Sequence, residues 1–310
     1  MGGFIKLISS NILAYVHINH TGGTTFKTLL GRLYFKNDIK KKIPLPDGYY
    51  KGGIAFKFSN KFPILTREYS SIPDYLKSNI EVVEGSVNDP FLKGMNCKYI
   101  TFLRHPIDRV ISHYYWHIRK GNSKIGQYIL NNKISLLDFL KEEKYFDVDN
   151  YMVRALLNDQ EGKNVAFGKI TDNHLKQAVE IMDHRFEIVG ITERYNESLT
   201  CMKIKLEWGR IPFYFKQNIG SGKRGIDNTT MIELNKLNKY DLMLYKHASE
   251  KLNQLIARQG FRFTRELDKL NMLLPVYRFV SRLNRVIRNP MLLVGKIQSI
   301  MHKSSLNILD

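Results

Sequence analysis

Cysteine is scarce in this chain, and long apolar runs are missing. The 310 residues include two cysteines, Cys97 and Cys201, which lie far apart in the sequence. Two unclustered cysteines form neither a disulfide framework nor a zinc site, so we expect a reducing, cytoplasmic environment and no bound metal. No apolar run reaches the ~18 to 20 residues that a membrane-spanning helix needs, and residues 1–17 lack the cleavage site of a signal peptide.

Acidic residues are also few, which leaves a large positive charge. Lysine and arginine number 48 against 29 aspartates and glutamates, a net charge of +19. Such an excess favours anionic partners such as nucleotides, nucleic acids, acidic glycans and lipid surfaces, although a well-solvated lysine-rich surface would give the same balance. The chain lacks a zinc finger, an RNA-recognition signature and a basic run interleaved with aromatics, so we do not expect it to bind nucleic acid.

Strand-like and helix-like segments alternate along residues 1–258. Apolar runs of strand length lie at 11–18, 54–58, 80–84, 98–103 and 186–191, and helical periodicity appears after several of them, including 134–182, 197–207 and 228–258. Strands that alternate with helices predict an α/β domain with a P-loop-like parallel sheet flanked by helices.

Residues 259–310 differ in character and are predicted to form a helical C-terminal extension. They hold nine lysines and arginines against three acidic residues. Within 276–287 one helix face is apolar and another is basic, with Val276, Phe279, Val280, Leu283 and Ile287 on the first and Arg278, Arg282 and Arg285 on the second. Such a helix either packs on the core or contacts a membrane surface or a partner, and the sequence leaves both open.

A glycine-containing turn follows the first predicted strand. The sequence His20-Thr21-Gly22-Gly23-Thr24-Thr25-Phe26 leads into a helical stripe, so a helix should begin near Thr24 or Thr25. The free N–H groups and dipole of a helix N-terminus attract anions, and glycines let a phosphate approach the backbone. The turn lacks the Gly-Lys-Ser/Thr of a Walker A loop, which argues against an ATPase or nucleotide kinase. An ordinary loop with a helix cap is the alternative.

A second strand, turn and helix supplies further candidates. Arg104 ends the strand at 98–103, Pro106 suits the first turn of a helix, and Ser112 lies one to two turns into it. The guanidinium fork fits a terminal phosphate, and the hydroxyl adds a donor. Further along the chain, residues 218–224 form a basic, glycine-containing stretch that includes Asn218, Gly220, Ser221, Gly222, Lys223 and Arg224. This stretch is either a nucleotide-binding loop or an ordinary basic surface loop.

In this order, these motifs resemble those of sulfotransferases that use 3′-phosphoadenosine 5′-phosphosulfate (PAPS), in the branch related to heparan sulfate 2-O-sulfotransferase and its bacterial relatives (sulfotransferase family 2). The family's first signature, roughly His-Ile-Pro-Lys-Thr-Gly-Gly-Thr-Ser/Thr-Phe, matches residues 17–26. Its second, roughly Phe-Leu-Arg-Asp-Pro-x-x-Arg-x-x-Ser, matches residues 102–112. Later blocks at 149–154, 189–194, 218–224 and 241–245 are similar too, so the resemblance spans about residues 11–258.

The resemblance implies roles for the residues that match. Thr21 to Phe26 would bind the 5′-phosphosulfate, Arg104 and Ser112 the 3′-phosphate, and the 218–224 loop the nucleotide. His20 stands where the family has a lysine that assists the leaving oxygen. A neutral histidine can donate one hydrogen bond there, and a protonated one can also supply charge.

The acceptor-activating base is the second departure from the family. Ser86 stands where the resemblance places a histidine, and serine is a poor base. Glu84 is the substitute that we expect, because residues two apart on a strand can share a face. Other candidates are Asp89, His105, His113 and His117. The chemistry requires no metal.

The sequence therefore predicts a sulfotransferase that moves a sulfuryl group from PAPS to a hydroxyl or amine of a small-molecule or glycan acceptor. The alternative is an inactive sulfotransferase-like protein that binds nucleotide and acts through interactions, which the two altered positions favour. The aromatic stretch 114–116 and residues 36–51 are candidates to line the acceptor cleft. The sequence predicts neither the acceptor's identity nor the oligomeric state.

Overall fold

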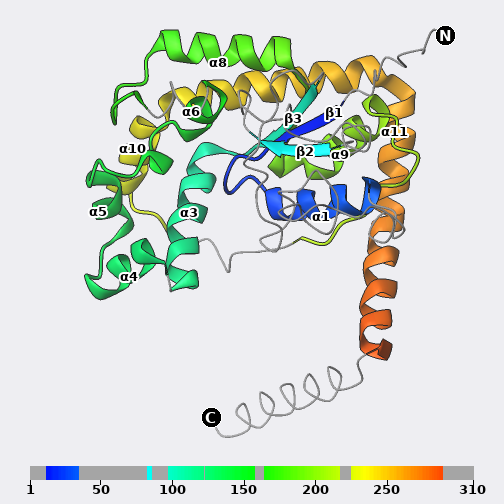
Figure 1. Ribbon diagram of the computed structural model, residues 1–310, viewed down its shortest axis with the longest axis horizontal. Helices are drawn as coiled ribbons and strands as arrows, with labels where there is room; N and C mark the ends of the chain where they lie inside the picture. The colour runs from blue at the N-terminus through cyan, green and yellow to red at the C-terminus, as the bar shows by residue number, and fades with distance from the viewer. Residues whose placement is uncertain are drawn as a thin grey trace, which may run out of the picture.

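A parallel sheet surrounded by helices forms the centre of the molecule (Figure 1). The computed structural model describes residues 12–34, 82–85, 97–121, 123–157, 164–216 and 225–288. Within them, the predicted α/β class with a parallel sheet, flanking helices and a helical C-terminal region is confirmed. The predicted strand at 54–58 lies outside the described residues.

In the described part of the chain the sheet has four strands in the order β2-β1-β3-β4, and every neighbouring pair is parallel. The strands are β1 (Ile12–Val16), β2 (Val82–Gly85), β3 (Cys97–Leu103) and β4 (Phe186–Ile191). All five residues of β1 are buried, as is usual for a strand covered by helices on both faces. In the register of the sheet, Val16 pairs with Gly85 on one side and with Thr101 on the other, so the carboxyl ends of β1 and β2 lie side by side.

Within the described residues, helices follow β1, β3 and β4. They are α1 (Gly23–Tyr34), α3 (Pro106–Lys120), α4 (Lys124–Asn131), α5 (Leu136–Lys141), α6 (Tyr151–Leu157), α8 (Asp172–Arg185), α9 (Tyr195–Lys205), α10 (Asn228–Leu237) and α11 (Lys239–Arg288), with short 3₁₀ turns η4 (Phe146–Val148) and η5 (Thr192–Arg194). Local sequence fixes several starts: Pro106 occupies the first turn of α3, and Ser135 and Asp138 form a capping box on α5.

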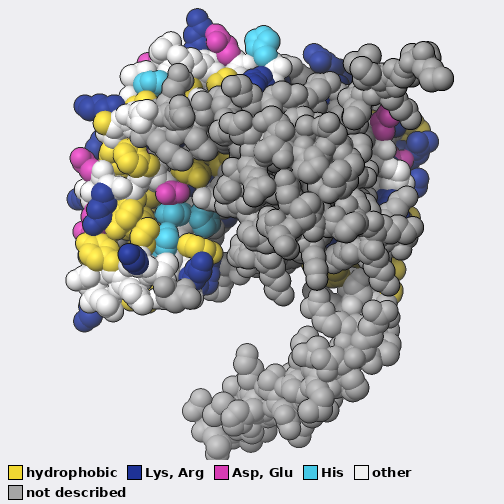
Figure 2. Space-filling view, in the orientation of Figure 1, with side chains coloured by type: hydrophobic (Ala, Val, Ile, Leu, Met, Phe, Trp, Pro, Cys, Tyr) yellow, Lys and Arg dark blue, Asp and Glu magenta, His cyan; other side chains and the backbone are white. Residues whose placement is uncertain are grey.

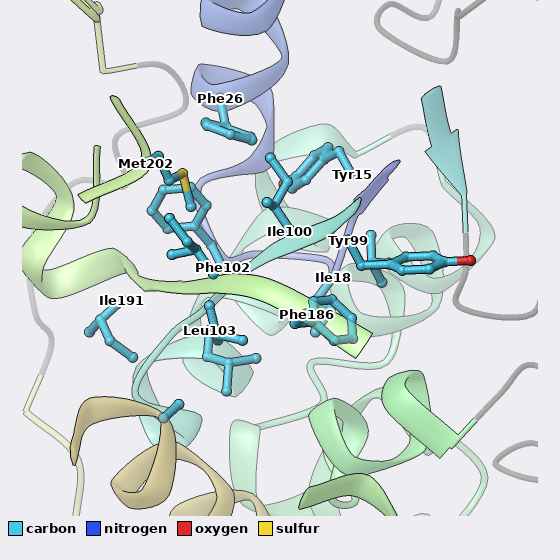
Figure 3. Close-up of a cluster of buried hydrophobic side chains, with 14 of the residues drawn as sticks. Tyr15, Ile18, Phe26, Tyr99, Ile100, Phe102, Leu103, Phe186, Ile191 and Met202 are labelled. Atoms are coloured by element: carbon cyan, nitrogen blue, oxygen red, sulfur yellow. The ribbon is translucent and has the colours of Figure 1, made fainter. Parts of the chain in front are cut away.

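Aromatic side chains join the sheet to the helices beside it. The ring of Phe102 in β3 lies 4.9 Å from Phe26 of α1 and 4.8 Å from Tyr195 of α9, measured between centroids. Figure 3 shows Phe26, Phe102 and Met202 together on one side of β4, with Leu103 and Ile191 on the other. Side chains alternate along a strand, so neighbouring residues of β3 pack against different layers. A second core cluster joins α3, α4, α5 and α10.

A buried polar network holds α6 against the start of α11. The carboxylate of Asp241 accepts hydrogen bonds from the backbone N–H groups of Met152 (2.9 Å) and Val153 (2.8 Å). In return, Oδ1 of Asn150 accepts hydrogen bonds from the N–H groups of Tyr240 and Asp241. Each helix therefore caps the other's N-terminus, where backbone donors have no partner within the helix. These contacts give two of the later family-like blocks, 149–154 and 241–245, a structural role.

The C-terminal helix α11 passes through the predicted boundary between residues 258 and 259 and kinks just beyond it. Gly260 has φ 52° and ψ −134°, a left-handed backbone conformation that glycine adopts at low cost. Beyond the kink, Phe263, Leu270 and Leu274 belong to the main core. None of the described helices is long and apolar enough to cross a membrane.

Candidate functional site

The two predicted phosphate units meet at one edge of the sheet. After β1 the chain adds β2 on one side of that strand, and β3 then pairs with β1 on its other side. The direction of strand order therefore reverses between β1 and β3. In open parallel sheets, ligands bind outside the carboxyl ends of the strands at such a switch point. Both the glycine turn and Arg104 follow these two carboxyl ends.

The first unit is the turn between β1 and α1. The helix α1 begins at Gly23, whereas the sequence predicted a start at Thr24 or Thr25. The first helical hydrogen bond runs from the N–H of Phe26 to the carbonyl of Gly22 at 3.2 Å. The buried hydroxyl of Thr21 donates to the carbonyl of Ile18 at 2.8 Å, which closes the turn. The N-terminus of α1 thus faces the switch point, where its dipole favours an anion.

The backbone and the packing of this turn also require glycine at both positions. Gly22 has φ 84°, which strains any other L-residue. A Cβ on Gly23 would lie 2.2 Å from the imidazole of His17 and 2.9 Å from the hydroxyl of Tyr15. The close approach of the Tyr15 and His17 side chains therefore requires glycine at 23, independently of any phosphate.

Arg104 connects the second unit to the first. Its Nη1 donates to the backbone carbonyl of His20 at 3.1 Å, across 84 residues of sequence. Ser112 lies in α3, half-buried, two turns after Arg104. The structure thus brings Arg104 and the glycine turn together.

Thr192 is a contributor whose role the sequence did not indicate. Its hydroxyl lies 2.8 Å from the carbonyl of Thr21 and 2.9 Å from that of Leu103, so one side chain holds both predicted phosphate units. The neighbouring Glu193 accepts a hydrogen bond from the N–H of His105 at 3.0 Å. In the sequence, only the resemblance of residues 189–194 to the sulfotransferase family pointed to Thr192 and Glu193. The function of these two residues in the fold is to fix the spacing between the two turns.

Histidines cluster beside the glycine turn. Nε2 of His20 lies 3.1 Å from Nδ1 of His113, at hydrogen-bond distance, and the ring of His20 meets that of Trp116 edge-on at 5.7 Å between centroids. His117 follows one turn after His113, and their rings are 4.7 Å apart. Figure 2 shows histidine side chains gathered on the surface over the region of α3. Nδ1 of His20 has no hydrogen-bond partner among the residues that the structure describes.

Burial keeps His20 and His113 neutral. Loss of solvation, followed by the nearby charges of Arg109 and Arg104, lowers the pKa of His20 to about 3. Loss of solvation and the proximity of His20 lower the pKa of His113 to about 2. Above about pH 5 both side chains are therefore uncharged, and His20 can offer one N–H but no positive charge.

Arg109 brings a positive charge under the site. It is fully buried, one of its Nη2 protons goes to the carbonyl of Asp147, and its guanidinium lies 4.9 Å from the ring centroid of Tyr151. Its Nε and Nη1 make no hydrogen bond within the described part of the chain. Its charge contributes to lowering the pKa of His20. Arg109 belongs to the second signature, but the sequence did not single it out.

The aromatic stretch divides between core and site. Tyr114 is buried in the second core cluster, and its hydroxyl donates to the carbonyl of Ile134 at 2.7 Å. Tyr114 therefore does not line a cleft, contrary to the prediction. Trp116 is half-buried beside His20, and Nζ of Lys120 lies 4.6 Å from its ring centroid. Tyr115 and Trp116 are both half-buried, so these two residues of the stretch keep an accessible surface.

The remaining candidates are only partly placed. Glu84 lies in β2 opposite Tyr15 in the register, one residue before the carboxyl end of that strand. Ser86, Asp89 and the predicted nucleotide loop, with Asn218, Gly220, Ser221, Gly222, Lys223 and Arg224, lie outside the described residues. So do residues 36–51.

Comparison with known proteins adds no identification: no protein-family model matches the chain, and the search of curated proteins gave no significant match. Among the described residues, no group of three or more histidine, cysteine, aspartate or glutamate side chains is arranged to hold a metal ion.

Proposed function

We propose that this chain is a PAPS-dependent sulfotransferase built on a P-loop-like sheet. The observation that carries the proposal is the hydrogen bond from Arg104 to the carbonyl of His20 at the switch point of the sheet. It joins two separate anion-binding units into one site, and a donor with phosphate groups at both ends of its ribose requires such a pair.

The donor would lie across the carboxyl ends of β1 and β3. Its 5′-phosphosulfate would meet the N-terminus of α1, from Thr21 to Phe26, and its 3′-phosphate would meet Arg104 and Ser112. The dipole of α1 and the charges of Arg104 and Arg109 give this edge a positive potential. The predicted loop at 218–224 would contribute further basic groups to the nucleotide.

The transfer forms one bond to sulfur and breaks another. The acceptor oxygen or nitrogen attacks sulfur with a lone pair, and the bond from sulfur to the bridging phosphate oxygen breaks. The electron pair stays on adenosine 3′,5′-bisphosphate, and the acceptor proton passes to a base. The products are the sulfated acceptor and the bisphosphate, so no further reactant is needed.

His20 would stabilise the charge that develops on the bridging oxygen. With Nε2 directed at His113, the other ring nitrogen is the one that can face the donor. If His113 donates from Nδ1, then His20 carries its proton on Nδ1 and presents it as a hydrogen-bond donor. A donor aimed at developing charge stabilises the transition state more than the ground state.

Glu84 remains the proposed base. A histidine whose pKa is as low as that of His113 accepts a proton weakly, and burial also lowers the pKa of His117. Glu84 lies near the carboxyl end of β2, directly beside β1, which is the edge where the acceptor must approach. Trp116 offers a flat apolar face for a glycan or a planar small molecule.

A non-catalytic nucleotide-binding protein is the second candidate. One observation favours it: the family's lysine is replaced by a histidine that burial keeps neutral, which removes a positive charge from the leaving oxygen. Both candidates bind the donor product, and only the enzyme turns over.

The proposed site is tested by measuring the melting temperature of the protein with and without nucleotide. Adenosine 3′,5′-bisphosphate at saturating concentration should raise the melting temperature, because a ligand that binds only the folded state adds about 2.7 kcal/mol of stability at 100 times its Kd. AMP serves as the control and should raise it much less, since it lacks the 3′-phosphate that Arg104 would hold. Equal shifts with both nucleotides would contradict the assignment of Arg104 and Ser112.

A further inference from the structure

An apolar stripe runs along the outer side of α11 beyond the kink at Gly260. Ten large hydrophobic side chains are exposed in the described part of the chain, and five of them lie here: Phe261, Met272, Val276, Phe279 and Val280. Phe261 is 81% and Phe279 67% exposed. Met272, Val276, Phe279 and Val280 are spaced as i, i+4, i+7 and i+8, which places them on one helix face, and Phe261 precedes Met272 by about three turns.

The opposite face of the same helix is already occupied. Phe263, Leu270 and Leu274 are buried in the main core. Tyr277 stacks on Phe213 with the ring centroids 4.6 Å apart, and Nε of Arg278 donates to the carbonyl of Tyr214 at 3.1 Å. These contacts fix the rotation of the helix, so the apolar stripe faces away from the body. Figure 1 shows this end of α11 extending past the other described elements.

Basic side chains accompany the stripe. Arg262, Arg265 and Lys269 are exposed, and Glu266 is turned inward onto Lys203 of α9 at 2.8 Å. The carboxylate of Glu266 also lies 3.6 Å from Nη2 of Arg265 and 3.7 Å from Nζ of Lys269. Asp268 is the one exposed acidic residue between 261 and 281, and the sequence adds Arg282, Arg285 and Arg288 without an acidic residue before the end of α11. The outer face therefore combines bulky apolar groups with positive charge.

We propose that residues 261–280 of α11 dock on an anionic lipid bilayer, with the stripe at the boundary between headgroups and acyl chains. An amphipathic helix with phenylalanines on one side and lysines or arginines beside them binds in this way. The charge selects the lipid over a second copy of the chain. Two copies packed through the stripe would bring their basic residues, and two bodies of net charge +19, together. An anionic surface neutralises them instead.

The stripe begins farther toward the N-terminus than the sequence indicated. The predicted apolar face started at Val276, and its described members Val276, Phe279 and Val280 are exposed. Phe261 and Met272 extend the same face by about four turns, with the exposed charged residues Arg265 and Asp268 between them. A chain shortened at Gly260 would lose Phe263, Leu270 and Leu274 from the core, so substitutions on the exposed stripe are the sound test.

The experiment is co-sedimentation of the full chain with vesicles made of equal parts phosphatidylcholine and phosphatidylglycerol. Wild type should bind them and should bind pure phosphatidylcholine vesicles at least ~10-fold more weakly, because each basic residue near an anionic surface contributes about 1 kcal/mol. Met272→Ser combined with Phe279→Ser should weaken binding to the mixed vesicles by ~10-fold or more, because the apolar contact is lost.

Leu130→Ser combined with Ile232→Ser is the matched control, because Leu130 on α4 is 49% exposed and Ile232 on α10 is 68% exposed, both outside α11. This control should bind as wild type does, and both double variants should keep the wild-type melting temperature because the altered side chains are exposed. The proposal is overturned if wild type does not co-sediment with the mixed vesicles, or if the two double variants bind these vesicles equally. It is overturned equally if the stripe variant only converts a dimer to a monomer in light scattering, which would identify a second copy as the occupant.

Discussion

His20→Ala should lower kcat for sulfuryl transfer by about 100-fold or more and leave the affinity for the donor nearly unchanged. The physical reason is that the N–H of His20 would act on charge that appears only in the transition state. The carbonyl that Arg104 contacts belongs to the backbone of residue 20, so the link between the two phosphate units survives the substitution. Steady-state rates and calorimetric binding of adenosine 3′,5′-bisphosphate separate the two effects.

Backbone geometry calls for a second variant at this position. His20 has φ 67°, where alanine is strained and glycine is not. His20→Gly should therefore lose as much kcat as His20→Ala, if the ring and not the backbone is responsible. His184→Ala, at an exposed histidine of α8, is the control and should be as active as wild type. Full activity in His20→Gly would remove His20 from the mechanism.

The pH dependence follows from the same residue. The pKa of His20 is lowered to about 3, so the side chain stays neutral and its contribution to kcat should not change between about pH 5 and 8. A loss of rate in that range would then come from another group, such as the base. His20→Lys should retain transfer, because a lysine side chain also donates hydrogen bonds and stands at this position in the sulfotransferases that the sequence resembles.

Arg104→Ala should weaken binding of adenosine 3′,5′-bisphosphate by roughly 30- to 150-fold, equivalent to about 2 to 3 kcal/mol. The reason is the loss of charge-assisted hydrogen bonds to the 3′-phosphate. Arg104→Lys should recover only part of the affinity, because a single ammonium replaces the guanidinium fork. Calorimetry on the three proteins measures these values.

AMP distinguishes a direct contact from a loosened turn. Arg104 also holds the carbonyl of His20, so its removal could disturb the glycine turn and weaken every nucleotide alike. A direct phosphate contact predicts that Arg104→Ala weakens the bisphosphate far more than AMP. An unchanged Kd for the bisphosphate, or equal losses for both nucleotides, would contradict the role of Arg104 in binding the 3′-phosphate.

Much of the sheet could be predicted because its strands are buried apolar runs. The run at 186–191 became β4 with the same bounds, and the run at 98–103 became β3 with one residue added. The start of α1 was placed one or two residues late: the helix begins at Gly23, where the side chains of His17 and Tyr15 leave no room for a Cβ. A close approach of that kind depends on side-chain positions in the strand, which periodicity does not contain.

The candidate site was predictable where a single segment supplies it and not where segments meet. Arg104 and the glycine turn could be found in their own motifs. Thr192, however, acts on Thr21 and Leu103, which lie 171 and 89 residues away, and nothing local marks a hydroxyl for such a role. The neutral state of His20 depends on burial and on Arg109, which are properties of the assembled fold. The aromatic run 114–116 divided between core and site because successive residues of a helix point in different directions.

Transfer of radiolabelled sulfur from PAPS to an acceptor is the decisive test of the proposed sulfotransferase activity. The purified chain is incubated with labelled PAPS and a panel of glycans, phenols, alcohols and amines, and the label and adenosine 3′,5′-bisphosphate are both quantified. If the chain is a sulfotransferase, at least one acceptor should gain label in an amount equal to the bisphosphate released. His20→Ala and Arg104→Ala should lose this transfer. If wild type binds adenosine 3′,5′-bisphosphate but passes label to no acceptor, the chain is a nucleotide-binding protein and the proposed enzyme activity is wrong.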